Sequence, residues 1–283
     1  MRKYWNAISV AALGLSFLIA VASFAQDTPG PGAGTPGPGK GKAGKGKAKA
    51  PSLPAPRNKE GRIVLGPGAA GTGFWGGGGS IIGGAGNLAL EAVPFQPWAR
   101  GLYDLRRTNA GQEDDPHVRC MPPGGPRQFQ TPNGFEFLEM PDLKRIYIVF
   151  GGGPRSWRVI YMDGRKLPTN DEDRVPTFLG YSTGHWEGDT LVVESEGYNE
   201  KFWMHRGGLP HTDALHLTEK FTRPDFDTLK YEVTINDPKA YTRPWTGSFN
   251  VPWTYTNWDG SPGGELQEYF CQDYERDVQL FDK

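Results

Sequence analysis

The sequence predicts an all-β fold, an antiparallel meander that closes into a lipocalin-like barrel or folds into a two-sheet sandwich. Short segments rich in Val, Ile, Tyr, Phe, Trp and Thr recur between residues 135 and 272, which is typical of strands. Turn-forming pairs such as Asp163-Gly164 and Gly188-Asp189 separate these segments and indicate hairpins. Helical periodicity is confined to one stretch before this region.

That stretch predicts one amphipathic helix before the strands. Phe95, Trp98, Leu102 and Leu105 follow one another at intervals of three, four and three residues, which places them on one face of a helix. Pro97 stands near the start, where its missing N–H costs no hydrogen bond.

The first 25 residues are predicted to be a secretory signal peptide. Arg2 and Lys3 precede an apolar run, and Ser23 and Ala25 stand before a cleavage point at Gln26, as in exported proteins. An uncleaved membrane anchor is the alternative, but the apolar run is shorter than the ~20 residues that a spanning helix needs. We therefore expect a periplasmic or secreted protein.

Residues 26–87 are predicted to be a disordered arm, followed by a single domain at residues 88–283. Pro, Gly and Lys dominate the arm, and such a composition has little to bury. Residues 26–62 carry eight basic and two acidic side chains, whereas residues 63–283 carry 21 basic and 30 acidic ones. The arm is expected to be a spacer, or to make weak contact with an anionic envelope surface. Nucleic acid is not expected as a partner, because no aromatic residues alternate with the lysines.

The chain has two cysteines, Cys120 and Cys271. In an oxidising compartment an even pair most simply forms one disulfide. A catalytic thiol is the alternative, but neither cysteine lies in a sequence context typical of a nucleophile.

Histidines and carboxylates gather in one part of the sequence. Four of the five histidines lie between His185 and His216. A carboxylate beside an imidazole orients it and stabilises its charged form, so this region could support general acid/base chemistry. The candidate catalytic residues are His211, His216, Asp213 and Glu194. Aromatic rings can stack on a small ligand, and polar side chains can hydrogen-bond to it. On this basis the candidate ligand-binding residues are His185, Trp186, Asn199, Trp203 and Tyr241.

The segment 213–221 leaves the position of one of these histidines open. Its alternation puts Leu217 and Glu219 on one face and His216 and Lys220 on the other. If the first face forms the core, His216 faces solvent; if the second lines a lumen, His216 faces a ligand.

Other chemistries are less well supported. His211, Asp213 and His216 are ordinary metal-ligand types, but their spacing matches no known signature, so no metal and no cofactor is expected. A serine nucleophile lacks a GxSxG motif. The run GGGPR at 151–155 is followed by a strand rather than a helix, so it is expected to be a hairpin loop and not a dinucleotide site.

Six sequence blocks resemble those of a large family of exported bacterial proteins of unknown function. They are RCMPPGGPR at 119–127, VIYMDGR at 159–165, GHWEGDTLVVESEGYN at 184–199, HTDALHLTEKF at 211–221, DPKAYTRPW at 237–245 and ELQEYFCQ at 265–272. The resemblance spans most of residues 94–277 and excludes the arm. It supports the domain limits and a Cys120–Cys271 disulfide, and it implies no reaction. At Glu194 this chain departs from the aspartate that the family usually carries.

These observations predict an exported barrel that binds a small hydrophobic, aromatic or sugar-like ligand in a polar lumen. Cofactor-free acid/base catalysis, by a hydrolase, isomerase or lyase, would require histidines and a carboxylate to converge in a cavity. The alternative is a non-catalytic carrier or cell-envelope scaffold. A packed interior with scattered histidines would favour that alternative.

Overall fold

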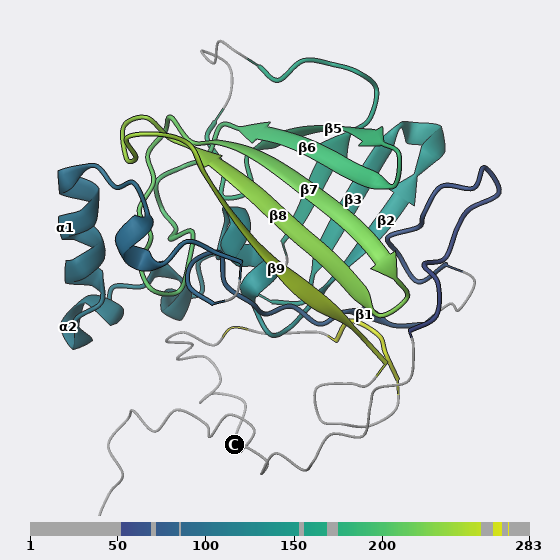
Figure 1. Ribbon diagram of the computed structural model, residues 1–283, viewed down its shortest axis with the longest axis horizontal. Coiled ribbons are helices and arrows are strands. Elements are labelled where there is room, and N and C mark those ends of the chain that lie inside the picture. The colour runs from purple at the N-terminus through teal and green to yellow at the C-terminus, as the bar shows by residue number, and fades with distance from the viewer. Residues whose placement is uncertain are drawn as a thin grey trace, which may run out of the picture. The chain divides into compact units, whose positions relative to one another are not determined.

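The protein folds into a closed β-barrel (Figure 1). The computed structural model describes residues 52–68, 72–84, 86–152, 156–168, 175–255, 263–267 and 271. Across these residues nine strands pair in chain order. They are β1 (Phe74–Trp75), β2 (Phe135–Met140), β3 (Arg145–Phe150), β4 (Trp157–Tyr161), β5 (Tyr181–Glu187), β6 (Thr190–Glu196), β7 (His216–Asp225), β8 (Thr228–Asn236) and β9 (Trp245–Thr254). The predicted all-β barrel is confirmed, and its closure excludes the two-sheet sandwich.

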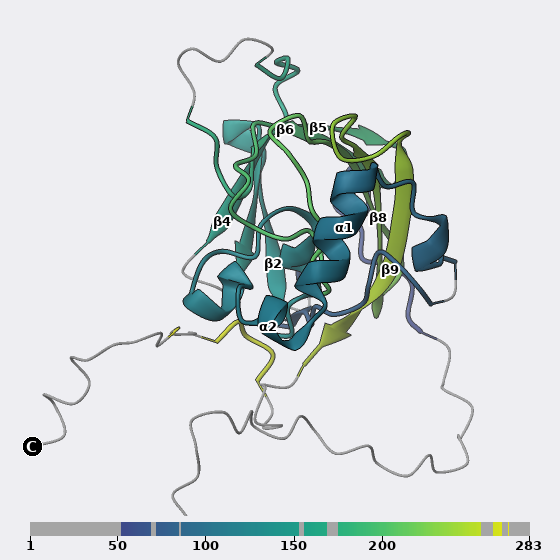
Figure 2. The ribbon, with the colours of Figure 1, turned by 90° about the vertical axis from the view of Figure 1, so that its left-hand side faces the viewer.

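The predicted helix is α1 (Pro97–Arg106), which lies at one end of the barrel (Figure 2). Its buried side differs from the expected one: Ala99 and Tyr103 are buried, while Trp98 and Leu105 are 47% and 62% exposed. We call this end the helix end. The other helical segments are short: α2 (Asn109–Gln112) and the 3₁₀ helices η2 (Leu90–Ala92), η3 (Pro116–Arg119), η4 (Gly125–Gln130) and η5 (Pro141–Leu143).

The opposite end of the barrel, which we call the mouth, carries the β2–β3, β5–β6 and β7–β8 turns (Figure 1). The tight β5–β6 hairpin is confirmed, since Glu187 pairs with Thr190 across Gly188 and Asp189. Gly188 has φ +58°, and glycine at this position allows the turn that matches the twist of the two strands.

The hairpin expected at Asp163-Gly164 is wrong. β5 pairs in parallel with β4, through Ile160 with Ser182 and Tyr161 with Thr183. Parallel neighbours need a long connection rather than a tight turn, and β4 and β5 are far enough apart in the sequence for one, since β4 ends at Tyr161 and β5 begins at Tyr181. Beyond Thr183 the described part of β4 gives β5 no further partner, although β5 continues to Glu187. The wall of the barrel is therefore incomplete near the mouth.

Aromatic side chains fill the middle of the barrel, so the predicted hollow lumen is wrong. The 3₁₀ helix η4 brings Phe129 inside, where it is fully buried. The Phe129 ring packs against the rings of Phe135, Phe150, Phe221 and Tyr231, with centroids 4.8–5.5 Å apart. Each of these side chains points inward from its strand because strand side chains alternate.

A buried ion pair occupies the same interior. Arg158 on β4 binds both carboxylate oxygens of Glu219 on β7, and the two side chains are 2% and 0% exposed. Arg158 also donates to Ser182 Oγ at 2.9 Å and to Ser195 Oγ at 2.5 Å. Tyr231 donates to Glu219 Oε1 at 2.8 Å. These contacts satisfy the buried charges and connect β4, β5, β6, β7 and β8.

The folded part begins earlier than the expected boundary at residue 88. Residues 52–68, which we call the N-terminal strap, bury Ile63 and Leu65 against the barrel. Arg223 on β7 fastens the strap by donating to the carbonyl oxygens of Val64 and Gly66, each at 2.8 Å. β1, at Phe74–Trp75, lies in the Gly-rich stretch after the strap and belongs to the wall. The expectations of a signal peptide and of a disordered arm over residues 26–51 lie outside the described residues.

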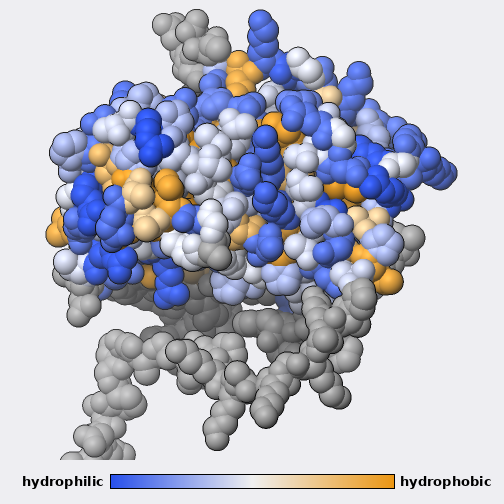
Figure 3. All heavy atoms as spheres, in the orientation of Figure 1, coloured by the Kyte–Doolittle hydropathy of each residue, from blue (hydrophilic) through white to orange (hydrophobic). Residues whose placement is uncertain are grey.

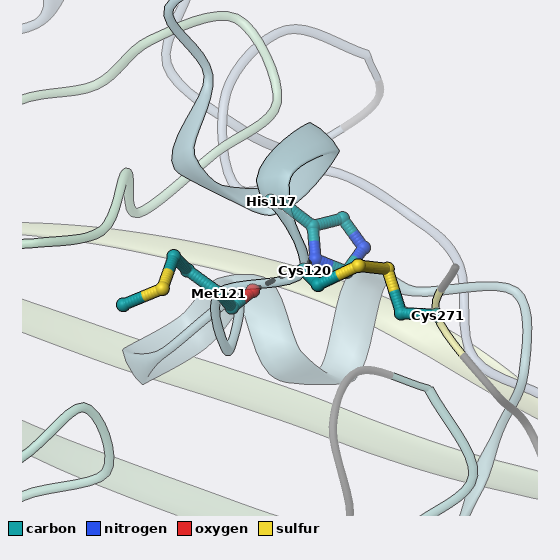
Figure 4. Close-up of a disulfide and its surroundings, with 4 residues drawn as sticks. All are labelled: His117, Cys120, Met121 and Cys271. Atoms are coloured by element: carbon teal, nitrogen blue, oxygen red, sulfur yellow. Dashed lines mark hydrogen bonds between the residues drawn. A yellow bond between two sulfur atoms is a disulfide. The ribbon is translucent and has the colours of Figure 1, made fainter. Parts of the chain in front are cut away.

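At the other terminus the predicted disulfide is confirmed. Cys120 and Cys271 are bonded, with their Cα atoms 5.5 Å apart (Figure 4). Beside it, His117 Nδ1 donates to the Met121 carbonyl at 3.1 Å. The strand-like segments predicted from the sequence extend to residue 272, but in the last of them, ELQEYFCQ at 265–272, the described residues 265–267 and 271 are not in a strand.

The outer wall differs between its two sides. On β2, β3 and β4 the outward side chains include Leu138, Met140, Tyr147, Trp157 and Val159, and Trp157 is 61% exposed. The side facing the viewer in Figure 3 is mainly hydrophilic, and on β7–β9 its outward residues are Thr218, Lys220, Thr222, Lys230, Glu232, Thr234, Thr246, Ser248 and Asn250.

We expect Glu219→Gln to destabilise the protein strongly. The substitution leaves the Arg158 guanidinium buried without a counter-charge, which typically costs about 3–5 kcal/mol in the free energy of unfolding. Urea denaturation monitored by circular dichroism measures the change. The matched control is Glu232→Gln in the exposed Lys230–Glu232 pair, where we expect a loss below about 1 kcal/mol. Equal losses for the two variants would contradict the role of the buried pair.

Candidate functional site

A groove of about 420 Å³ opens at the mouth, beside the point where β4 stops short of β5. We call it the mouth groove. The strap, the β2–β3 connection, the segment after β4, and β5 all contribute to it. Its lining residues are Arg62, Glu139, Met140, Pro141, Lys144, Arg145, Ile146, Met162, Gly164, Gly184, His185 and Trp186.

The inner side of the groove is apolar and depends on a glycine. A Cβ atom at Gly184 would lie 2.8 Å from Ile160 Cγ2 and 2.9 Å from Met162 Sδ, distances too short for real contacts. The absence of a side chain at Gly184 therefore lets Met162 pack against β5. Ile146 is buried beside them. Methionine adapts its shape readily, so this surface can fit an apolar guest.

Trp186 forms an aromatic wall of the groove, and an arginine from the strap holds it. The Arg62 guanidinium lies 4.0 Å from the centre of the Trp186 ring, within the range of a cation–π interaction. Arg62 Nη2 also binds Glu139 Oε2 at 2.6 Å, and Nη1 donates to the Ile63 carbonyl at 3.1 Å. These contacts orient the ring and join the strap to β2 and β5.

The rim of the groove is mainly cationic. Arg145 donates to Tyr147 Oη at 3.3 Å, and its guanidinium lies 5.2 Å from the centre of the Tyr161 ring. Lys144, the preceding residue, also lines the groove. His185 stands at the edge with its side chain 59% exposed and its Nε2 atom 3.1 Å from Glu187 Oε1. Thus two of the predicted ligand-binding residues, His185 and Trp186, lie together in the groove.

Of the predicted catalytic residues, the structure brings two together, outside the barrel. His216 Nε2 lies 3.2 Å from Glu194 Oε2, and Thr218 donates to the same oxygen at 3.0 Å. Of the two positions that the sequence left open for His216, the structure gives the outward one, because Leu217 and Glu219 on the same strand point inward and are fully buried. The pair therefore stands on the outward faces of β6 and β7, about one-third exposed.

The other two predicted catalytic residues are apart from this pair. His211 is 6% exposed and lies between the carbonyl oxygens of Phe202 and Thr212, with Nε2 at 3.1 Å and Nδ1 at 3.3 Å. Burial lowers the pKa of His211 to about 4. Asp213 accepts from Lys239 Nζ at 2.6 Å on the surface.

The remaining ligand-binding candidates make structural contacts at the helix end. Asn199 Oδ1 accepts from the backbone N–H of Lys201 at 3.0 Å. Tyr241 donates to the Pro210 carbonyl at 2.8 Å. Trp203 is buried, and the Arg106 guanidinium lies 4.9 Å from its ring centre. None of these three lines the mouth groove.

A serine–histidine contact that sequence reasoning missed is structural rather than nucleophilic. His205 Nδ1 accepts from the Gly207 N–H at 2.9 Å, so in the neutral ring the proton is on Nε2. That N–H donates to Ser80 Oγ at 3.1 Å, and Ser80 donates to the Ile82 carbonyl at 2.6 Å. Burial lowers the pKa of His205 to about 4. The imidazole is thus in the wrong tautomer to take the serine proton.

Sequence reasoning also missed much of the groove. Arg62 was placed in the disordered arm, and Glu139 and Met162 had no distinguishing context. The family-like sequence blocks were a signal that could have located it. VIYMDGR contributes Met162 and Gly164 to the groove, and GHWEGDTLVVESEGYN, which is separate in the sequence, contributes Gly184, His185 and Trp186.

Across the described ranges, no three or more His, Cys, Asp or Glu side chains are grouped so that they could hold a metal ion. The helices in the described part of the chain are too short or too polar for any of them to cross a membrane.

Comparison with protein-family models gave no match for this chain, and comparisons with curated proteins and with solved structures gave none either.

We expect the buried histidines to make stability depend on pH. The pKa of His211 is about 4 in the folded protein, against an ordinary value of 6.5, so between these values the unfolded chain binds more protons. Stability is complete above about pH 6.5 and falls as the pH drops toward 4, by roughly 2–3 kcal/mol for this residue. Urea denaturation across this range should show a weaker pH dependence for His211→Asn.

The control is Phe202→Leu, which disturbs the ring that packs against His211 at 4.1 Å but removes no titratable group. It should lower stability about equally at every pH. An unchanged pH dependence in His211→Asn would show that the buried imidazole does not contribute.

Proposed function

We propose that this protein is a non-catalytic binding protein whose mouth groove takes a small, flat, apolar molecule. The observation that carries the proposal is the combination of the Trp186 ring with the apolar side chains of Met140, Ile146 and Met162 in one groove of about 420 Å³. Ligand sites typically have volumes of about 300–1,000 Å³, apolar linings and a few polar groups. Aromatic rings such as that of Trp186 bind flat ligands by stacking.

The packed interior supports a site at the mouth rather than deep inside. Phe129 and its aromatic neighbours fill the middle of the barrel, and the Arg158–Glu219 pair lies in the same interior. A ligand that entered farther would displace close-packed rings or an ion pair, and both changes are costly.

The positions of the titratable groups support binding without catalysis. The His216–Glu194 pair stands on the outer wall and is not part of the mouth groove. In the groove itself, His185 Nε2 contacts Glu187, and Glu139 is paired with Arg62. A general base needs to be within hydrogen-bond reach of a bound substrate, and neither arrangement provides a free base facing the Trp186 ring.

We also propose that the protein works in the periplasm or outside the cell. The Cys120–Cys271 disulfide supports this location, because disulfides persist mainly in oxidising compartments. The amino-terminal sequence, with its basic start and apolar run, supports it independently.

We expect the neutral apolar dye N-phenyl-1-naphthylamine to bind the wild-type protein with increased fluorescence, and Trp186→Ala to weaken this binding. Losing the stacking surface is expected to cost about tenfold in affinity. The matched control is Trp157→Ala, which removes an equally large ring from the outer face of β4. A double variant, Glu194→Gln with His216→Ala, should bind as the wild type does.

Two outcomes would contradict the proposal. One is the absence of saturable dye binding to the wild-type protein. The other is equal weakening by Trp186→Ala and Trp157→Ala, which would place the dye on general apolar surface rather than in the groove.

A further inference from the structure

We propose that the mouth groove selects flat ligands that carry a carboxylate or a similar anionic group. This inference rests on the proposed function, since it names the chemical class of the ligand for the same groove. The two cationic side chains Lys144 and Arg145, at the start of β3, would hold the anion, while the Trp186 side of the groove would hold the apolar body.

The charges that line the groove do not balance. Arg62, Lys144 and Arg145 contribute three cations, and Glu139 contributes the one carboxylate. The Glu139 carboxylate already binds Arg62 at 2.6 Å. Lys144 and Arg145 have no carboxylate within ion-pair distance in the described part of the chain. Two positive charges are therefore available to a ligand.

Arg145 is held in place before any ligand binds. Its guanidinium contacts Tyr147 Oη and the Tyr161 ring, and its backbone is fixed by pairing with Met140 on β2 and Tyr161 on β4. A guanidinium that is already oriented loses less freedom when it binds a carboxylate. Lys144 adds a second, more flexible charge beside it.

The cationic rim contrasts with the rest of the folded chain. Residues 63–283 carry 30 acidic and 21 basic side chains, so acidic side chains outnumber basic ones in this part of the chain. A second depression, on the outer wall, is lined by Glu187, Thr190, Lys220, Thr222, Lys230 and Glu232. Its two lysines and two glutamates balance, and its other two lining residues are threonines. The mouth groove therefore combines apolar surface with unpaired positive charge, as an aromatic acid would require.

The test compares two probes of nearly the same shape, 2-naphthoate and the uncharged 2-naphthamide, by isothermal titration calorimetry in low-salt buffer. The wild-type protein should bind 2-naphthoate at least about tenfold more tightly than 2-naphthamide. The double variant Lys144→Gln with Arg145→Gln should lose this preference but keep its affinity for 2-naphthamide, which also shows that the groove is intact. The preference should shrink as salt is added.

The control variant is Lys220→Gln with Lys230→Gln, which removes the same charge from the outer wall and should keep the preference. Equal affinity of the wild-type protein for both probes would overturn the inference and leave the proposed function standing. A preference that survives in the Lys144/Arg145 variant would also overturn it. If neither probe binds, the proposed function fails together with the inference.

Discussion

The buried ion pair between Arg158 and Glu219 is the constraint on which the rest of the structure depends. Two charges removed from water must be paired and hydrogen-bonded, or folding becomes unfavourable. Here the partners come from five consecutive strands: Arg158 from β4, Ser182 from β5, Ser195 from β6, Glu219 from β7 and Tyr231 from β8. Satisfying the pair therefore requires these strands to be in register, including the parallel β4–β5 pair.

This constraint also determines where a ligand can bind. The ion pair and the rings around Phe129 occupy the barrel interior, so a ligand cannot enter the middle of the barrel without displacing them. The mouth groove lies where the wall is incomplete. β4 ends at Tyr161 while β5 continues to Glu187, and the strap covers part of the resulting opening with Arg62. The mouth groove is thus a consequence of unequal strand lengths, and its aromatic wall and cationic rim follow from the residues at those strand ends.

The concentration of histidines between residues 185 and 216 does not produce one site. His185 lies at the mouth, His205 and His211 are held in loops by backbone groups, and His216 stands on the outer wall. Proximity in the sequence brought only His216 near a predicted carboxylate partner, Glu194. The other imidazoles bind backbone groups or local side chains, as buried or half-buried polar groups generally must.

Local patterns in the sequence determined β2 to β9, α1 and the β5–β6 hairpin, because period and turn residues act over a few residues. Ring chemistry made His185 and Trp186 candidates for ligand binding, and that role stays a prediction. Only the tertiary structure decided that Glu219 rather than His216 points inward, that β5 pairs in parallel with β4, and that Arg62 belongs to the groove. The physical reason is that barrel closure pairs residues that are far apart in the chain. A strand with polar residues on both faces shows which face is buried only when its distant partners are in place. For Glu219 that partner is Arg158 on β4.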